Sequence, residues 1–244
     1  MFRISQAKLG KLFNIITKPY LLSFLFGYKV AGGVEHKRIL EACKYKLIVD
    51  VGANKGQFAI ASRYYSPSAR VISFEPLPSA FKVLKKIFLS DPMVLSYCCG
   101  IGNKNSTTTI YISNSDDSSS LLPMGKKQES IFPGTYQVGT LEIEVKKLTE
   151  FIAVNEIPEN SLLKIDVQGY EYEVLEGALP LLSSFKFIYC ECSYTELYAG
   201  QKLAEDVIKL LEYSNFELVD RYNLYLDNGK APIQADFLFR NKIS

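Results

Sequence analysis

The residues best suited to chemistry lie in one stretch, Asp50-Val-Gly-Ala-Asn-Lys-Gly-Gln-Phe58. Before it, Leu47 to Val51 is a short, apolar and β-branched run, which predicts a buried parallel strand. Its two glycines, four positions apart, predict a sharp turn into a helix that starts near Gln57. In an open α/β sheet, ligands bind outside the carboxyl ends of the strands, beside a turn of this kind.

The spacing in this stretch discriminates between ligands. A dinucleotide site would show Gly-x-Gly-x-x-Gly, and a phosphate-binding P-loop would end in Gly-Lys-Ser/Thr. Here the middle glycine is absent, and Gly56 is followed by Gln57 and Phe58. An acidic residue at the turn suits a cationic ligand, and S-adenosylmethionine carries an ammonium and a sulfonium group without any phosphate. A glycine turn that serves packing alone is the alternative.

A second carboxylate lies where a nucleoside needs one. Arg70 to Phe74 is another short β-branched run, and Glu75 follows it directly. Nucleoside-binding α/β folds place an acidic residue about 20 residues beyond the glycine turn, where it accepts hydrogen bonds from the ribose hydroxyls. The alternative is a solvated acid that precedes Pro76 at the start of the next helix.

Four blocks of the chain resemble the FkbM-type S-adenosylmethionine-dependent methyltransferases. They are the glycine stretch, Phe74-Glu-Pro76, Leu162 to Ala178 and Ile233 to Phe239, in the family's order. The resemblance runs from about Val34 to Phe239. It implies a class I methyltransferase fold, which is an α/β, Rossmann-like, mostly parallel seven-stranded sheet with helices on both faces and a C-terminal antiparallel hairpin. It also implies O-methylation of a hydroxyl group.

The resemblance assigns roles to individual residues. The residues expected to hold S-adenosylmethionine are Asp50, Gly52, Ala53, Asn54, Gly56, Phe58, Glu75 and Gly100. Two residues are expected to act on the acceptor, His36 and Asp166. Asp166 lies near the C-terminal end of a predicted strand from Leu162 to Val167. The residues expected to contact the acceptor are Ser119, Ser120, Gln168 and Glu191. Asp166 could instead cap the following helix, His36 could be a packing residue, and Gly100 could be a plain turn glycine.

The chain departs from the family pattern after the run Leu141 to Val145. The family has Leu-Asp there, and this chain has Leu148-Thr149-Glu150, so no role is transferred to that position. The Thr-rich run Ser106 to Ser113 predicts another strand. Between these two runs, the polar segment up to Gly139 is expected to form a lid over the pocket.

The remaining elements complete a βα pattern. Expected helices are 37–43, 57–65, 78–89, 170–177 and 202–213. Expected strands are 47–51, 70–74, 94–98, 106–113, 141–145, 162–167, 187–192, 216–219 and 236–240, with a turn at 99–102.

Composition limits the partners. The chain has 244 residues and a net charge of +2, which provides no general attraction to nucleic acid. Its five cysteines and single histidine show no metal-type spacing, so no metal ligand is assigned, although the carboxylate of Asp166 could help hold a divalent metal. Free, buried thiols indicate a reducing, cytoplasmic setting.

Residues 1–33 are expected to form a separate helical, apolar extension ahead of a methyltransferase domain at 34–244. Their apolar run is interrupted at Lys18-Pro19 and is too short for a bilayer span, which needs about 20 apolar residues. Three interpretations remain open: a cap on the core, a partner or dimer surface, or a basic amphipathic surface peripheral to the inner face of the membrane.

The predicted function is methylation of a hydroxyl group on a small-molecule or glycan acceptor, with a sugar of a bacterial surface polysaccharide as first choice. The alternatives are methylation of a secondary-metabolite hydroxyl and a non-catalytic methyltransferase-fold binding module in glycan assembly. A dinucleotide oxidoreductase is disfavoured by the missing middle glycine.

Overall fold

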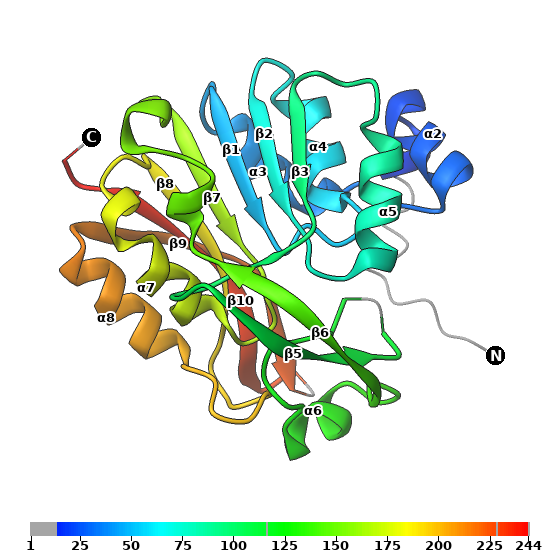
Figure 1. Ribbon diagram of the computed structural model, residues 1–244, viewed down its shortest axis with the longest axis vertical. Helices are drawn as coiled ribbons and strands as arrows, with labels where there is room; N and C mark the ends of the chain where they lie inside the picture. Colours follow the sequence, from blue (N-terminus) through cyan, green and yellow to red (C-terminus); the bar gives the residue numbers. More distant parts are fainter. Residues whose placement is uncertain (1–13, 116, 228, 244) are drawn as a thin grey trace.

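One sheet of seven strands organises the molecule, in the order β3-β2-β1-β7-β8-β10-β9 (Figure 1). The computed structural model describes residues 14–115, 117–227 and 229–243. The five parallel strands are β3 Val94–Tyr97, β2 Arg70–Phe74, β1 Leu47–Val51, β7 Ser161–Ile165 and β8 Phe187–Ser193. An antiparallel hairpin of β9 Phe216–Asp227 and β10 Ala231–Asn241 completes the sheet next to β8. The predicted fold class is confirmed.

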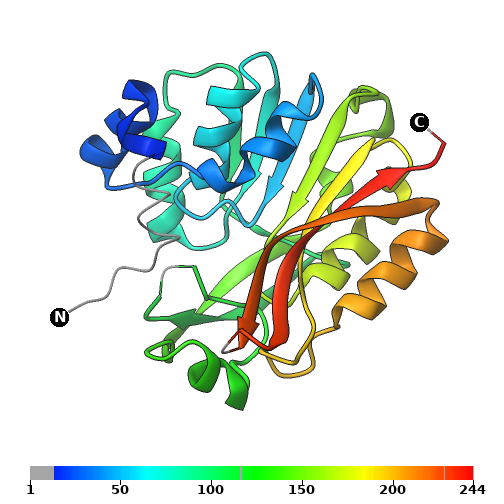
Figure 2. The same cartoon turned by 180° about the vertical axis from the view of Figure 1, so that it is seen from behind.

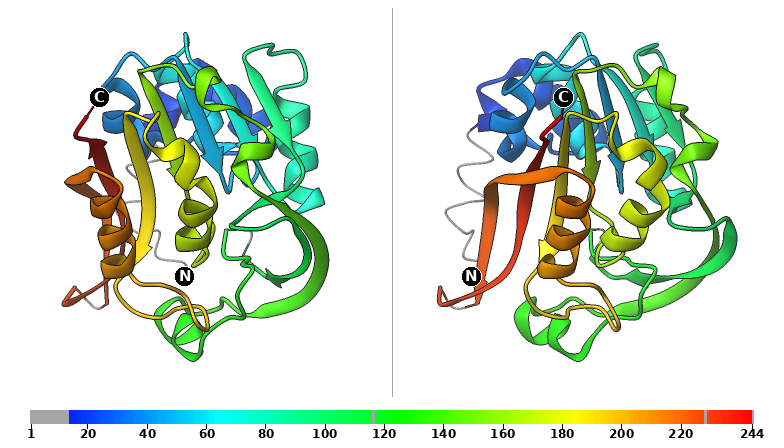
Figure 3. Two further views of the ribbon diagram at one scale, coloured as in Figure 1. Left: turned by 60° about the vertical axis from the view of Figure 1, so that its left-hand side comes forward. Right: turned by 90° about the vertical axis from the view of Figure 1, so that its left-hand side faces the viewer.

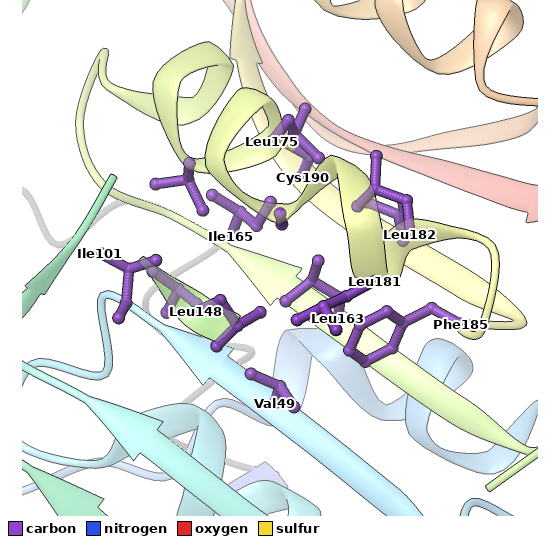
Figure 4. Close-up of a cluster of buried hydrophobic side chains, with 14 of the residues drawn as sticks. Val49, Ile101, Leu148, Leu163, Ile165, Leu175, Leu181, Leu182, Phe185 and Cys190 are labelled. Carbon is purple, nitrogen blue, oxygen red and sulfur yellow. The ribbon is translucent and has the colours of Figure 1, made fainter. Parts of the chain in front are cut away.

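Helices cover both faces of this sheet because its central strands are apolar on both sides. On one face lie α3 Lys37–Glu41, α4 Gln57–Tyr65 and α5 Pro78–Ile87 (Figure 2). Ile48 and Leu162 belong to the buried cluster on this face. On the other lie α7 Glu171–Leu182 and α8 Ala204–Tyr213, which are side by side in Figure 3. Val49, Leu163 and Phe185 pack beneath α7 (Figure 4).

A second, three-stranded sheet lies beyond the carboxyl ends of the parallel strands (Figure 1). Its members are β4 Gly100–Ile101, β6 Gln137–Lys146 and β5 Ser106–Ser113, in that order. The predicted turn at 99–102 therefore contains a strand, and β6 extends well beyond the predicted 141–145. Pairing with β5 satisfies the backbone of these exposed residues. Pairing with β10 likewise extends β9 beyond Val219.

Two glycines allow close contacts between chain segments. A Cβ at Gly52, where φ is +81°, would lie 1.8 Å from the carbonyl oxygen of Asp166. A Cβ at Gly177 would lie 2.0 Å from the carbonyl oxygen of Gly102. The prediction that α7 ends at Gly177 was wrong, because this glycine lets the helix pass the chain near β4, and the helix continues to Leu182.

Part of the N-terminal extension packs on the core. α2 Pro19–Tyr28 buries Leu21, and Ile15 and Val30 are buried in the same cluster as Ile60 of α4. Residues 14–33 therefore cap the α4 side of the sheet. Among the described residues, no helix is both long enough and apolar enough to cross a bilayer. Residues 1–13 of the predicted extension lie outside the described residues.

The cap predicts a contrast between two apolar residues of α2. Leu21→Ala should lower the free energy of unfolding by about 2–5 kcal/mol, because it leaves a cavity at a side chain that is 0% exposed. Phe26→Ala, at a side chain that is 79% exposed, should change it by no more than about 0.5 kcal/mol. Urea unfolding measures both, and equal losses would contradict the cap.

Candidate active site

A buried ion pair joins the two central strands at the rim of the sheet. Asp50 of β1 and Lys164 of β7 are register partners, and Lys164 Nζ lies 3.1 Å from Asp50 Oδ1. Lys164 Nζ also donates to the carbonyl of Gly52 at 3.1 Å and lies 3.6 Å from Asp166 Oδ2. Burial by itself lowers the pKa of Lys164, but the carboxylates of Asp50 and Asp166 outweigh it and raise this pKa. The lysine is therefore charged and holds two carboxylates in place.

Glu75 is fixed at the end of β2 by two backbone donors. Its Oε2 accepts from the N–H of Asn54 and its Oε1 from the N–H of Leu77, both at 2.8 Å. The residue is only 6% exposed, so the alternative of a solvated acid was wrong. Burial raises the pKa of Glu75 to about 7, although both backbone bonds act against this. Each oxygen keeps a lone pair for a further donor, such as one hydroxyl of a diol.

A cleft beside Glu75, called here the first cleft, encloses about 670 Å³ of space free of protein atoms, part of it open to solvent. Its apolar wall consists of Val51, Phe74, Pro76, Leu77, Cys99, Ile101, Ile110, Leu121 and Val167. Its glycine and polar lining consists of Gly52, Asn54, Glu75, Gly100, Asp117, Ser119, Ser120, Asp166 and Gln168. An apolar slot with a few placed polar groups is typical of a small-molecule site.

Asp166 is held in position by the amide of Gln168. Gln168 Nε2 donates to Asp166 Oδ1 at 2.9 Å and to Glu191 Oε2 at 2.8 Å, and its Oε1 accepts from the hydroxyl of Tyr198 at 2.9 Å. The backbone of Gln168 is left-handed, with φ +58°. In this conformation its side-chain amide contacts both Asp166 and Glu191. The Asp166 side chain is still 37% exposed. It does not cap α7, whose N-cap residue is Tyr170.

Glu171 fixes the loop that carries Asp166 and Gln168. Its Oε1 accepts from the N–H of Val167 at 3.1 Å and of Gly169 at 3.0 Å. The residue is 4% exposed, and burial raises its pKa to about 7. Glu171 therefore positions this loop from behind.

A second cleft adjoins the first and is more polar. It encloses about 700 Å³, part of it open to solvent. Its lining consists of Ser115, Asp117, Ser118, Gln128, Phe132, Thr135, Asp166, Gln168, Glu191 and Gln234. Asp117, Asp166 and Gln168 line both clefts, so the two spaces meet at the exposed carboxylate of Asp166.

The residues predicted to bind the cofactor fall into two groups. Gly52, Asn54, Glu75 and Gly100 line the first cleft. The others support the turn from behind: Asp50 is buried against Lys164, Ala53 donates its N–H to Phe74, Gly56 caps α4 with φ +95°, and Phe58 packs its ring 5.5 Å from Lys164 Nζ.

Of the residues predicted for the acceptor, all but His36 line a cleft. Ser119 and Ser120 line the first, Glu191 the second, and Asp166 and Gln168 line both. His36 Nδ1 lies 3.1 Å from the Tyr189 hydroxyl and 4.0 Å from Asp236 Oδ2, outside both linings. Its action on an acceptor stays a prediction.

The residues of the site that were not assigned from the sequence include Asp117, Gln128, Glu171 and Gln234. Gln234 donates to Glu191 Oε1 at 2.9 Å, and its place in the C-terminal block was a usable signal. Gln128 and Asp117 lie in the segment expected to form a lid. That segment supplies walls to both clefts, with α6 Lys126–Ile131 beside the second.

Comparison with known proteins decides the family. The model of the methyltransferase FkbM domain matches residues 50–218. The chain belongs to the FkbM methyltransferase family. It is therefore an enzyme, a methyltransferase of the S-adenosylmethionine-dependent kind, as the resemblance implied.

Two relatives and one solved structure illustrate the similarity. The 2-O-methyltransferase NoeI of Sinorhizobium fredii is 28% identical over 202 residues, which is 80% of this chain and 79% of NoeI. The hexuronic acid methyltransferase AglP of Haloferax volcanii is 28% identical over 194 residues, 75% of this chain and 74% of AglP. The crystal structure of TehB from Haemophilus influenzae superposes with a TM-score of 0.51 at 8% identity, covering 91% of this chain and 67% of TehB. It supports the fold alone.

The buried ion pair predicts a large effect of one substitution. Lys164→Met should destabilise this FkbM methyltransferase by about 3–5 kcal/mol, because it leaves Asp50 buried without its countercharge. Adding Asp50→Asn should restore much of that loss. As a matched control, Lys209→Met removes an exposed lysine paired with Glu205 and should change little. Chemical denaturation compares the four proteins. A double variant as unstable as the single one would argue against the pairing.

Proposed function

We propose that this methyltransferase transfers the methyl group of S-adenosylmethionine to a hydroxyl group of a sugar in a surface polysaccharide or other glycan. The observation that carries the proposal is the meeting of the two clefts at Asp166. The first cleft has the features of a nucleoside site, and the second is lined by hydroxyl, amide and carboxyl groups. Asp166 lies between them, so a ligand in either cleft would contact its carboxylate.

The first cleft fits S-adenosylmethionine in its chemistry. Glu75 has lone pairs for two ribose hydroxyls, and the apolar wall around Leu77 and Ile101 suits an adenine ring. Carboxylates at Glu75, Asp117 and Asp166 favour the ammonium and sulfonium charges of this donor. When bound, the donor supplies an electrophilic methyl group on sulfur.

Asp166 is the group proposed to act on the acceptor. Its carboxylate can accept a hydrogen bond from the acceptor hydroxyl and orient that oxygen, then take the proton as the oxygen becomes bonded to the methyl group. Gln168 fixes one of its oxygens, and Lys164 lies behind the other. Correct placement of reacting atoms at about 3–3.5 Å accounts for much of the rate in such a transfer.

The names of two relatives support the proposal: one supports O-methylation and the other supports a sugar as the acceptor. NoeI is a 2-O-methyltransferase, and AglP acts on hexuronic acid. The polar lining of the second cleft is consistent with a ligand that carries many hydroxyl groups. No contact in the described residues favours a secondary-metabolite hydroxyl over a sugar.

The proposed ribose contact predicts a pH-dependent affinity. Donation from ribose hydroxyls favours the charged form of Glu75, whose pKa is about 7 without ligand. Binding should therefore lower this pKa and release a proton. The affinity for S-adenosylhomocysteine should rise as the pH increases through about 7 and level off above it.

Isothermal titration calorimetry between about pH 5.5 and about pH 8.5 measures this dependence and, in two buffers, the released proton. Glu75→Gln is the control and should bind weakly with a flat profile. A flat profile for the unchanged protein would contradict a ribose contact at Glu75.

The role of Asp166 predicts a loss of turnover without a loss of donor binding. Asp166→Asn should lower kcat for methyl transfer to a sugar acceptor by about 10²–10⁴-fold while the affinity for S-adenosylhomocysteine is retained. Asp220→Asn is the control, because this exposed carboxylate of β9 lines neither cleft. It should cause a far smaller loss. Labelled methyl transfer provides the measurement, and full turnover by Asp166→Asn would remove Asp166 from the mechanism.

A further inference from the structure

The second cleft is acidic. Asp117, Asp166 and Glu191 line it, and no lysine or arginine is found among the described residues that line either cleft. The nearest buried cation, Lys164, is engaged by Asp50 and the carbonyl of Gly52. A ligand in this space therefore faces carboxyl groups. If the ligand carried an anionic group, no basic side chain of the described lining would pair with it.

Acidic side chains crowd the buried end of this cleft, which therefore disfavours negative charge. Glu191 accepts hydrogen bonds from the amides of Gln168 and Gln234. Burial raises its pKa well above the usual range, the neighbouring carboxylates of Asp166, Asp236 and Glu171 raise it further, and Lys164 acts against them. A further carboxylate or phosphate placed here would be repelled and desolvated.

An independent feature indicates what kind of ligand group fits. Gln128 of α6 lines the second cleft and is only 2% exposed. Its Nε2 lies 3.4 Å from the Tyr198 hydroxyl, whereas its Oε1 is buried and has no hydrogen-bond partner among the described residues. Buried polar groups are almost always hydrogen-bonded. A ligand hydroxyl that donates to Gln128 Oε1 would supply the missing hydrogen bond.

We propose that the sugar unit methylated in the second cleft is uncharged, without a carboxylate or phosphate on its ring, and that Gln128 Oε1 accepts a hydrogen bond from one of its hydroxyl groups. This inference rests on the proposed function and narrows its substrate class. Hydroxyl groups suit this lining because each can donate to a carboxylate or to the amide oxygen. The ring of Phe132, 4.8 Å from that of Tyr225, adds an apolar surface for the carbon face of a sugar.

The proposal separates this chain from one of its relatives. AglP is named for hexuronic acid, an anionic sugar, and is 28% identical over 194 residues. The lining described here has no basic side chain to pair with a uronate. The two proteins are related methyltransferases but therefore differ in the charge of the acceptor that each would use.

Matched pairs of acceptors test the charge directly. The methyl glycosides of glucose, galactose and mannose are compared with those of the corresponding uronic acids, with labelled S-adenosylmethionine as donor. For a pair that is used, kcat/KM should be at least about tenfold higher for the neutral sugar. A uronate used equally well or better would overturn the inference while leaving the proposed function intact. Methylation of no sugar of either kind would overturn both.

Two variants test the cause of the preference. Asp117→Asn should raise kcat/KM for the uronate relative to that for the neutral sugar, because it removes an exposed carboxylate from the cleft. The ratio is compared at saturating donor because Asp117 also lines the first cleft. Gln128→Met, of similar volume, should raise KM for the neutral sugar about fivefold or more while kcat and the affinity for S-adenosylhomocysteine are retained.

Glu129→Gln is the matched control, since it changes an exposed neighbour on α6 that lines neither cleft. Thermal unfolding checks that each variant is folded. If Gln128→Met is not folded, Asp117→Asn alone decides the electrostatic part. An unchanged preference in Asp117→Asn, or an unchanged KM in folded Gln128→Met, would overturn the inference.

Discussion

The positive charge of Lys164 holds the acidic side chains at the rim of the sheet in place. Parallel strands deliver their last side chains to one edge, and here two neighbouring strands deliver Asp50 and Asp166. A cation that lies between two carboxylates offsets their mutual repulsion. Lys164 supplies that cation from within the sheet, which leaves the solvent side of Asp166 open. The lysine also binds the carbonyl of Gly52 and so ties the turn after β1 to the same point.

The site combines contributions from two sheets. The seven-stranded sheet supplies Glu75 and Asp166 on rigid strand ends, and the smaller sheet covers them with Gly100, Ile101 and Ile110. Neither sheet forms a cleft by itself. The smaller sheet is tied to the body of the domain where Gly102 passes Gly177 of α7, since only glycine permits that approach. This close approach anchors the wall of the first cleft to α7.

The sequence predicted those parts of the fold and site that depend on local pattern. Short β-branched runs followed by an acid placed Glu75 and Asp166 at one edge, because the carboxyl ends of parallel strands converge. Asp50 was expected to face the ligand, yet strand register, which no local pattern specifies, sets it against Lys164. Asp117 and Gln128 reach the site only through the pairing of β5 with β6, a long-range feature that composition does not reveal.

The connection between β5 and β6, residues 114–136, has a consequence for how the family can diversify. It contributes six side chains to the second cleft: Ser115, Asp117, Ser118, Gln128, Phe132 and Thr135. The strand ends that hold Glu75 and Asp166 come from elsewhere in the chain. A change of length or sequence around α6 in this connection can therefore reshape the second cleft while Glu75 and Asp166 are kept, provided that Asp117, Ser119, Ser120 and Leu121, which also line the first cleft, are retained. For protein engineering, it is the natural segment to exchange between relatives or to randomise in a library.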